Sequence, residues 1–328
     1  MREETLRPGG VANMYGDVPP FMGFEHVPDP ADLNADIAVL GMPYDGLATF
    51  RGGATRRGPQ EIRKFSLLFG SYHFDWDLHL DDLRVADVGD IDVVPGNNAE
   101  SYRRLEERMA TVLGRGAIPL MLGGDHGVTY PGVRAVTTHT RRPLGLIVFD
   151  THLDLSEALD GDRLTRASPM LRISELAEVD PRRMCIIGAR GPRNLPEWTP
   201  LARELGINVF PMDQVEREGI EAVTEAARAA ASADGADVYI SVDIDGVDPA
   251  YAPGTNSPEP GGLTSREIIR GVRVAARNGF AGFDIVEVSP DFDTASGTTS
   301  TLAARLGVEA LYCQAAHRAG RHDSWRTG

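Results

Sequence analysis

The chain has few cysteines and no long apolar run. Two cysteines, Cys185 and Cys313, occur in 328 residues, and they form no CxxC pair and no dense framework. This usage favours a reducing compartment, and we expect both side chains to be buried apolar residues. No apolar run approaches the ~18 residues of a membrane span, and the polar first residues show no signal-peptide core. The sequence therefore predicts a cytoplasmic protein that does not enter a membrane.

Basic residues are also scarce relative to acidic ones. Lys and Arg total 33 against 48 Asp and Glu, which gives a formal net charge of −15. Such a chain repels nucleic-acid phosphates and anionic lipid headgroups, so we expect neither nucleic acid nor a membrane as a partner. The hydrophobic content of 42% and charged content of 25% are ordinary for a folded globular protein.

The chain shows no repeat, no low-complexity tract and no clear linker. We therefore expect a single domain over residues 1–328, with 1–35 as an N-terminal extension. Short apolar runs recur and end in Gly, Pro or an acid; they span residues 36–43, 84–91, 118–125, 144–150, 183–189, 207–211, 237–243 and 282–288. Several are apolar throughout, which is typical of parallel strands covered on both faces.

Segments with helical periodicity lie between these runs, at residues 99–116, 219–235 and 265–279. Each has a glycine near its end, and Ser265 is the expected N-cap of the third. Alternating strands and helices predict a three-layer α/β/α sandwich with a mostly parallel sheet of about eight strands. In such sheets the reactive groups gather at the carboxyl ends of the strands.

Polar side chains follow four of the apolar runs. They are Asp125 and His126; Asp150, His152 and Asp154; Asp243, Asp245 and Asp248; and Glu287. Taken singly, an Asp at a strand end is more often a helix cap or a turn residue, and Asp248, directly before a proline, fits a turn. Asp125 suits either hydrogen bonding to backbone groups or holding a ligand in place, and His126 is the better ligand. The D-x-H-x-D and D-x-D patterns together indicate more than capping.

The spacing explains why carboxylates would be tolerated there. Residues i, i+2 and i+4 of an extended chain share a face, so Asp150, His152 and Asp154 can converge, as can Asp243 and Asp245. Two bare carboxylates ~5 Å apart repel by about 3 kcal/mol at an effective dielectric near 20. Their pKa values rise and they hold protons unless a cation lies between them. A pair of divalent ions is the simplest compensation, and carboxylates with imidazoles suit Mn²⁺ or other borderline first-row ions.

Five ordered motifs carry a family resemblance: GGDH (123–126), DTHLD (150–154), SVDIDGVDPAYAPGT (241–255), PGGL (260–263) and EVSP (287–290). With them the chain resembles the ureohydrolase family, which includes arginase and agmatinase. GMPYDG (41–46), RGGATRRGPQEIR (51–63) and IGARG (187–191) resemble its agmatinase-like branch. The resemblance implies an α/β/α sandwich, a binuclear manganese site, and hydrolysis of a guanidino compound to urea and an amine.

The resemblance also implies roles for individual residues. The implied metal ligands are His126, Asp150, His152, Asp154, Asp243 and Asp245. In the family pattern His126 and Asp154 serve one metal, His152 and Asp245 serve the other, and Asp150 and Asp243 bridge both. The implied cofactor is two Mn²⁺ per chain, with Ni²⁺ as the alternative. Agmatinase-like members are often hexamers built from trimers, so a trimeric or hexameric homo-oligomer is expected.

The resemblance also implies catalytic or substrate-binding roles for two carboxylates and one hydroxyl. Asp154 would orient the attacking water and pass on its proton. Glu287 would pair with the guanidinium of the substrate in a charge-assisted contact. Ser257 lies where the family usually has a Thr whose hydroxyl lines the site. Thr151 and Asn256 depart from the family's Ala and Gly beside the site.

The largest departure is the loss of a histidine that the family is credited with using as a proton shuttle. Arg166 stands in its place in LTRASPM (164–170), and no histidine occurs between His152 and His317. Arginine does not release its proton at neutral pH, so Arg166 either binds an anionic group of the substrate or faces solvent. The surrounding residues 154–166 carry Glu157, Asp160, Asp162 and Arg163, which leaves the charge of the substrate's tail open.

The sequence is consistent with three candidate functions. The first is a metal-dependent amidinohydrolase acting on agmatine, a guanidino acid or another guanidino-bearing metabolite. The second is a metal-binding but catalytically weak subunit of a ureohydrolase complex, suggested by the missing histidine. The third is a related α/β deacylase with a single zinc, which needs fewer acids.

Overall fold

A parallel sheet forms the centre of the molecule, and it positions the site. The computed structural model describes residues 18–46 and 53–321. Within them nine strands pair in the order β1-β5-β2-β6-β11-β10-β7-β8-β9, and every pairing in this sheet is parallel. The strands are β1 (Glu25–His26), β2 (Ile37–Gly41), β5 (Val85–Asp90), β6 (Ile118–Leu122), β7 (Leu144–Phe149), β8 (Val179–Ala189), β9 (Asn208–Pro211), β10 (Asp237–Asp243) and β11 (Gly282–Val286).

The eight predicted runs all form strands, so the expected architecture is confirmed. The ninth strand, β1, has two exposed residues at the sheet edge, too short to give a periodic signal. A separate antiparallel pair, β3 (Tyr72–His73) and β4 (Leu78–His79), lies outside the main sheet.

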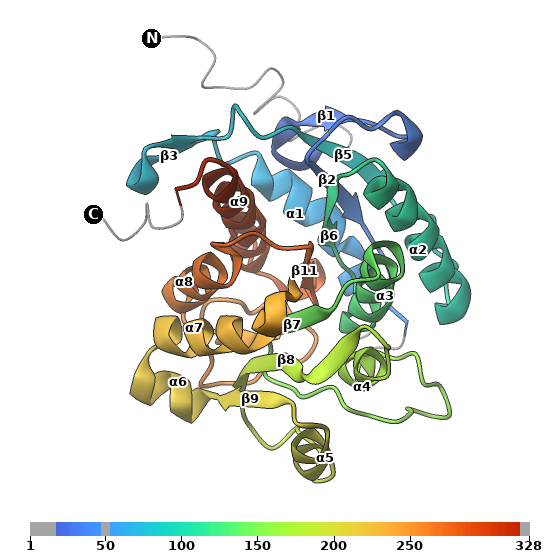
Figure 1. The fold of residues 1–328 in the computed structure, drawn as a ribbon, viewed down its shortest axis with the longest axis vertical. Helices are drawn as coiled ribbons and strands as arrows, with labels where there is room; N and C mark the ends of the chain where they lie inside the picture. The colour runs from blue at the N-terminus through green and yellow to red at the C-terminus, as the bar shows by residue number, and fades with distance from the viewer. Residues whose placement is uncertain (1–17, 47–52, 322–328) are drawn as a thin grey trace.

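Helices cover both faces of the sheet, as Figure 1 shows. One layer holds α2 (Asn98–Gly114), α3 (Thr129–Thr140), α4 (Pro169–Ser174) and α5 (Trp198–Leu205). The other holds α1 (Gly58–Ser66), α6 (Met212–Glu218), α7 (Ile220–Ala231), α8 (Ser265–Ala276) and α9 (Thr298–Arg318). Strand side chains alternate between two apolar clusters: Ile147 and Phe149 of β7 join one, and Leu146 and Val148 join the other. This double burial explains why the central strands read as continuous apolar runs.

The three predicted helices are confirmed as α2, α7 and α8, with ends that shift by up to four residues. The expectation that Ser265 caps α8 is wrong. Thr264 is the N-cap: its hydroxyl accepts from the backbone N–H of Glu267, and the Glu267 carboxylate accepts from the N–H of Thr264. Ser265 is instead the first helical residue, because this reciprocal pair stabilises the helix start one position earlier.

The sequence reasoning missed α9, the longest helix, which has 21 residues. Nearly its whole length is buried against α1, α8 and β11, so it lacks the polar stripe by which an amphipathic helix is recognised. A carboxylate, Glu309, lies fully buried within it. Arg273 of α8 donates two hydrogen bonds of 2.8 and 2.9 Å to Glu309, and Arg305 donates from Nε at 2.7 Å.

Other expectations concern the cysteines, the membrane and the domain boundary. Cys185 in β8 and Cys313 in α9 are free and buried, as predicted. Among residues 18–46 and 53–321, no helix combines the length and apolarity that crossing a membrane requires. The single domain over residues 1–328 with an extension at 1–35 stays a prediction. Residues 1–17 lie outside the described residues, and β1 belongs to the sheet.

We predict that the Glu309→Gln substitution lowers the free energy of unfolding by about 2 kcal/mol at pH 7, because it leaves the partly buried guanidinium groups of Arg273 and Arg305 without their carboxylate. Burial alone would raise the pKa of Glu309, but hydrogen bonds with His73 and Arg273 and the nearby arginine charges lower it to about 2. A lowered pKa in the folded state adds stability above the ordinary value of ~4.3, and this stability is lost as the pH falls toward 2.

The difference between wild type and Glu309→Gln should therefore narrow between pH 4.5 and 2. Urea denaturation of both proteins, stripped of metal, measures it across this range. Glu225→Gln is the control, because Glu225 forms a partly exposed pair with Arg277 and should contribute less than about 1 kcal/mol. An equal effect of the two substitutions at pH 7 would contradict this account of Glu309.

Candidate active site

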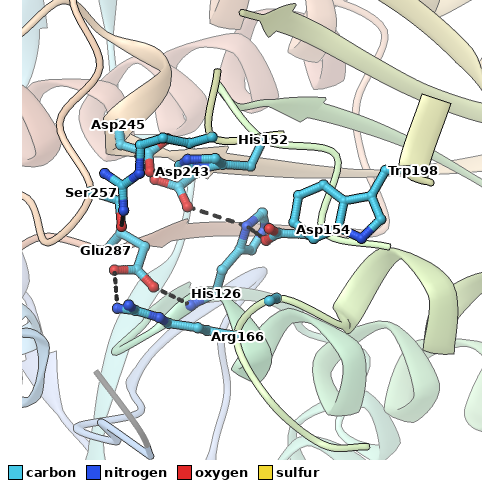
Figure 2. A pocket seen from close by; sticks show the side chains of 11 residues that line it. His126, His152, Asp154, Arg166, Trp198, Asp243, Asp245, Ser257 and Glu287 are labelled. Carbon is cyan, nitrogen blue, oxygen red and sulfur yellow. Dashed lines mark hydrogen bonds and ion pairs between the residues drawn. The ribbon is translucent and has the colours of Figure 1, made fainter. Parts of the chain in front are cut away.

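Four neighbouring strands end at one edge of the sheet and bring the predicted polar side chains together. β6, β11, β10 and β7 are adjacent and parallel, so the residues that follow them meet. They surround a cavity of about 140 Å³. Its lining residues are His126, His152, Asp154, Arg166, Ala167, Arg193, Trp198, Asp243, Asp245, Ser257 and Glu287. Asp150, which has no exposed surface, lies beside them. Figure 2 shows the labelled side chains gathered around one space, although they come from separate segments of the chain.

Glycine in the GGDH motif allows the close backbone contacts that place His126. A Cβ at Gly124 would lie 1.8 Å from the carbonyl oxygen of Tyr44. The same stretch is held by hydrogen bonds from Asp125 N to Tyr44 O (2.9 Å) and from Glu287 N to Gly124 O (2.8 Å). Asp125 accepts hydrogen bonds from the backbone N–H groups of Gly46 and Gly127. It therefore stabilises the backbone, which is one of the two roles expected for it from the sequence.

The predicted ligand atoms converge on two neighbouring points. His126 Nδ1 lies 3.0 Å from Asp150 Oδ2, 3.0 Å from Asp154 Oδ2 and 3.2 Å from Asp243 Oδ2. His152 Nδ1 lies 3.2 Å from Asp245 Oδ2 and 3.6 Å from Asp150 Oδ1.

Two groups of potential ligands follow, within which the ligand atoms lie no more than 4.8 Å apart. One group is His126, Asp150 and Asp243, and the other is Asp150, His152 and Asp245. Asp150 belongs to both.

The hydrogen-bonding pattern fits a cation at this place. His126 Nδ1 and Asp150 Oδ2 are buried, yet neither has a partner in hydrogen-bonding geometry although they lie 3.0 Å apart. Buried polar atoms are almost always satisfied, so atoms left unsatisfied and aimed at a common point indicate a missing partner. Two imidazoles and four carboxylates form a donor set that suits Mn²⁺ and similar ions.

The electrostatics of the site lead to the same conclusion. Burial and the charges of Asp245 and Asp150 raise the pKa of Asp243 well above its usual range. Burial and the charge of Asp150 raise the pKa of Asp154 as well. For His152, burial alone would lower the pKa, but Asp245 and Asp150 raise it to about 12. Without cations the cluster therefore retains protons, as the sequence reasoning expected.

Two of the site's carboxylates rest on unusual backbone. Asp154 has φ of 48° and Glu287 has φ of 61°, and both are among the seven described non-glycine residues with positive φ. For Glu, which gains no local hydrogen bond there, a left-handed conformation costs about 1 kcal/mol or more. The Glu287 carboxylate is held by His126 N at 2.9 Å and by Asn256 Nδ2 at 3.3 Å. Asn256, which departs from the family's usual Gly, therefore contacts Glu287, a residue predicted to bind the substrate.

A buried acid that the sequence reasoning missed supports His126. Asp284, in the middle of β11, accepts hydrogen bonds from Ser241 Oγ at 2.5 Å and from Tyr239 OH at 2.9 Å. Because Ser241 gives its hydrogen to Asp284, its oxygen can accept from His126 Nε2, 3.3 Å away. This arrangement favours the tautomer of His126 that leaves Nδ1 free to bind a metal. The signal in the sequence that could have identified Asp284 is an acidic residue within an otherwise apolar strand.

Arg166 points into the cavity rather than to solvent. Its side chain is 9% exposed, and its Nη1 lies 4.0 Å from Glu287 Oε2 (Figure 2). Three other lining residues, Ala167, Arg193 and Trp198, were not predicted as site residues. Arg193 donates from Nη2 to Ser257 Oγ at 3.2 Å, and Trp198 forms part of the cavity wall. Neither Arg193 nor Trp198 lies in a motif with recognisable spacing.

Asp248 is a turn residue, as expected from the proline that follows it. Its side chain accepts hydrogen bonds from Ala250 N and Gly261 N.

Comparison with known proteins identifies the family. The model of the Arginase family matches residues 35–313. The chain belongs to the arginase family. It is 39% identical to a guanidinopropionase of Pseudomonas aeruginosa over 312 residues, which covers 94% of each chain. It is 37% identical to a mitochondrial agmatinase of Gallus gallus over 277 residues, 84% of this chain and 80% of that one.

Among solved structures of the arginase family, the chain resembles the proclavaminate amidino hydrolase of Streptomyces clavuligerus. The TM-score is 0.84 at 35% identity, over 93% of this chain and 99% of the other. The fold and the ureohydrolase resemblance expected from the sequence are therefore confirmed. Residues 51 and 52 of the RGGATRR stretch lie outside the described residues.

We predict that Asp284→Ala and Ser241→Ala each lower the affinity for Mn²⁺ by about 10- to 100-fold, because each removes the hydrogen bond between these side chains that sets the His126 tautomer. Equilibrium dialysis against graded Mn²⁺, followed by elemental analysis, measures the affinity. Tyr239→Phe is the control: it removes the other hydrogen bond to Asp284 and leaves Ser241 in place. Wild-type affinity in both of the first two variants would show that this chain of contacts does not act on the metal ligands.

Proposed function

We propose that this protein is a binuclear metal-dependent amidinohydrolase, which hydrolyses a guanidino compound to urea and an amine. The single observation that carries the proposal is that Asp150 belongs to two adjacent ligand groups, with Glu287 facing the same cavity. Similarity to proteins named guanidinopropionase and agmatinase supports the reaction class.

We assign the metal ligands as the sequence predicted: His126, Asp150, His152, Asp154, Asp243 and Asp245. The proposed cofactor is two Mn²⁺ per chain, with Ni²⁺ as the alternative. When bound, a divalent pair supplies a water molecule with a pKa near ~7, so that it can attack at neutral pH. The six ligand side chains carry four negative charges when the imidazoles are neutral, and two divalent ions balance them.

The remaining chemistry belongs to the chain's own side chains. Glu287, held by His126 N and Asn256, would accept hydrogen bonds from the guanidinium and turn its carbon toward the metal ligands. Asp154 would orient the attacking water, take its proton and return it to the departing nitrogen, as the C–N bond breaks. Ser257 lines the same cavity and would contact the substrate. Because Arg166 cannot transfer a proton at neutral pH, Asp154 takes the role that the family's histidine otherwise has.

One observation favours the catalytically weak subunit as a second candidate. The Arg166 guanidinium lies 4.0 Å from Glu287, close to where the substrate's guanidinium is proposed to bind. The guanidinium groups of Arg166 and of the substrate would then share the Glu287 carboxylate. Both can bind only if Arg166 lies to one side of Glu287 and leaves the other side to the substrate. The single-zinc deacylase is less favoured, because it leaves the second ligand group without a purpose.

The setting of the protein is also proposed. We infer a cytoplasmic enzyme, which the free buried thiols of Cys185 and Cys313 support. A trimeric or hexameric homo-oligomer is proposed on the family resemblance.

We predict that protein loaded with Mn²⁺ or Ni²⁺ releases urea from at least one member of a guanidino panel, and that removing the metal abolishes this release. The panel contains agmatine, 3-guanidinopropionate, 4-guanidinobutyrate, guanidine and arginine. A urea assay on loaded, stripped and reloaded protein measures the effect. Asp150→Asn, at the ligand common to both groups, should lower kcat by at least about 10³-fold.

Asp180→Asn is the matched control, because Asp180 pairs with the exposed Arg182 outside the cavity. No urea from any compound, with two ions bound per chain, would contradict the amidinohydrolase and support the weak subunit. One ion per chain, in protein that releases no urea, would instead support the single-metal deacylase.

A further inference from the structure

The cavity carries more positive charge than the proposed metal ligands require. Apart from those ligands, the charged residues among its described lining are Glu287, Arg166 and Arg193. Among these three lining residues, one carboxylate faces two guanidinium groups, which leaves one positive charge in excess. Two divalent ions balance the four ligand carboxylates, and the charge of Arg166 also acts on the buried Asp125 beside it. The guanidinium of Arg193, which has no carboxylate partner among the described residues, is therefore the positive charge that remains for the tail of the substrate.

A surplus positive charge discriminates between the two kinds of substrate tail. Agmatine carries a guanidinium and an ammonium, whereas a guanidino acid carries a guanidinium and a carboxylate. With Glu287 engaged by the guanidinium, the second positive charge of agmatine would lie among like charges. The carboxylate of a guanidino acid would be attracted there instead.

The acids of residues 154–166 do not supply the missing negative charge. Glu157 is engaged by Arg163 at 2.9 Å and by Arg172 at 3.0 Å. Asp162 accepts from Asn98 Nδ2 at 2.6 Å and from the backbone N–H of Leu164 at 2.8 Å. Neither is among the described residues that line the cavity. Apart from the proposed metal ligand Asp154, Arg166 is the one charged residue of this loop among the described residues that line the cavity.

Arg193 is the better placed of the two arginines to receive a carboxylate. Its one hydrogen bond among the described residues goes to Ser257 Oγ, a neutral hydroxyl, and it forms no ion pair there. The nearby Arg190 is different, because its guanidinium is used by the backbone carbonyls of Asp245 and Gly246. Arginine has five N–H donors in a planar fork that matches a carboxylate, so Arg193 retains donors for a ligand.

The segment that carries Arg193 is fixed to the metal-binding loop. The neighbouring Asn194 donates from Nδ2 to Thr151 O at 2.9 Å and accepts from Leu153 N at 2.9 Å. Thr151 and Leu153 flank the proposed ligand His152 on either side. Arg193 is therefore held at a set distance from the reacting centre, as a residue that measures the length of a substrate must be.

We propose that the substrate is a guanidino acid whose carboxylate is bound by Arg193 together with the hydroxyl of Ser257. The guanidinium then lies against Glu287, and Arg166 adds to the positive potential around the tail. This inference rests on the proposed amidinohydrolase function and narrows its substrate class. It makes Arg193 a specificity-determining residue that contacts the part of the substrate remote from the bond that breaks.

The test compares substrates that differ only in the charge of the tail. Urea release is measured for 4-guanidinobutyrate, 4-guanidinobutanamide and agmatine, with guanidino acids of two to five carbons to find the preferred length. Wild type should prefer the acid over its amide by about 10- to 100-fold in kcat/KM, because a charge-assisted pair is lost in the amide. Arg193→Gln should remove this preference mainly through KM, and Arg193→Lys should restore part of it. Arg193→Glu should shift the preference toward agmatine.

Arg203→Glu is the matched control, since Arg203 is an exposed residue of α5 that does not line this cavity. It should leave the acid-to-amide ratio unchanged. Calorimetric binding of 4-guanidinobutyrate to metal-free protein gives a readout without turnover, and Arg193→Gln should weaken it. Urea released equally from acid and amide, with no effect of Arg193→Gln, would overturn this inference and leave the amidinohydrolase intact. Binding that depends on Arg193, without urea from any compound, would support the inference and overturn the proposed reaction.

Discussion

Mutual repulsion among buried carboxylates is the constraint on which the rest of the site depends. Asp150, Asp154, Asp243 and Asp245 are buried within reach of two imidazoles, and unpaired ligand atoms of His126 and Asp150 face one another. Water cannot stabilise these charges, so positive charge must come from protons or from metal ions. Protons would give an inert cluster, whereas a pair of divalent ions turns the same arrangement into a centre that can activate water.

The fold brings these carboxylates together through the ends of its parallel strands, and neighbouring residues then orient them. Parallel strands end together, so residues distant in the sequence meet without long loops. Close backbone contacts at Gly124 and the left-handed backbone at Glu287 then aim individual side chains. Asp284 and Ser241 act one layer further out, where they orient His126 from within two strands. Stability lost by strain and by buried charge at this edge is offset by two apolar clusters that cover both faces of the sheet.

Much of this could be predicted from the sequence, because it rests on local periodicity and on spacing. All eight apolar runs are strands, and the D-x-H-x-D and D-x-D side chains gather at one edge of the sheet. The extended i, i+2 geometry expected for them is wrong, because residues 150–154 lie beyond the end of β7 and Asp245 lies in a 3-10 turn after β10. The rest depends on tertiary contacts that leave no local pattern. The α9 helix is buried on all sides and has no polar stripe, and Thr264 rather than Ser265 caps α8 because of a reciprocal contact with Glu267. Arg193, Trp198 and Asp284 act through neighbours far along the chain, so their roles required the fold. The orientation of Arg166 was open for the same reason.

We propose that one carboxylate, Asp150, serves two metal positions, because it belongs to both groups of potential ligands. Electron paramagnetic resonance of the Mn²⁺-loaded protein tests it most directly, because two Mn²⁺ ions that share ligands are magnetically coupled. We predict the broad, multiline spectrum of a coupled pair at two ions per chain. We also predict that Asp150→Asn weakens or abolishes the coupling. A simple six-line spectrum of isolated Mn²⁺ in fully loaded wild-type protein would contradict the account.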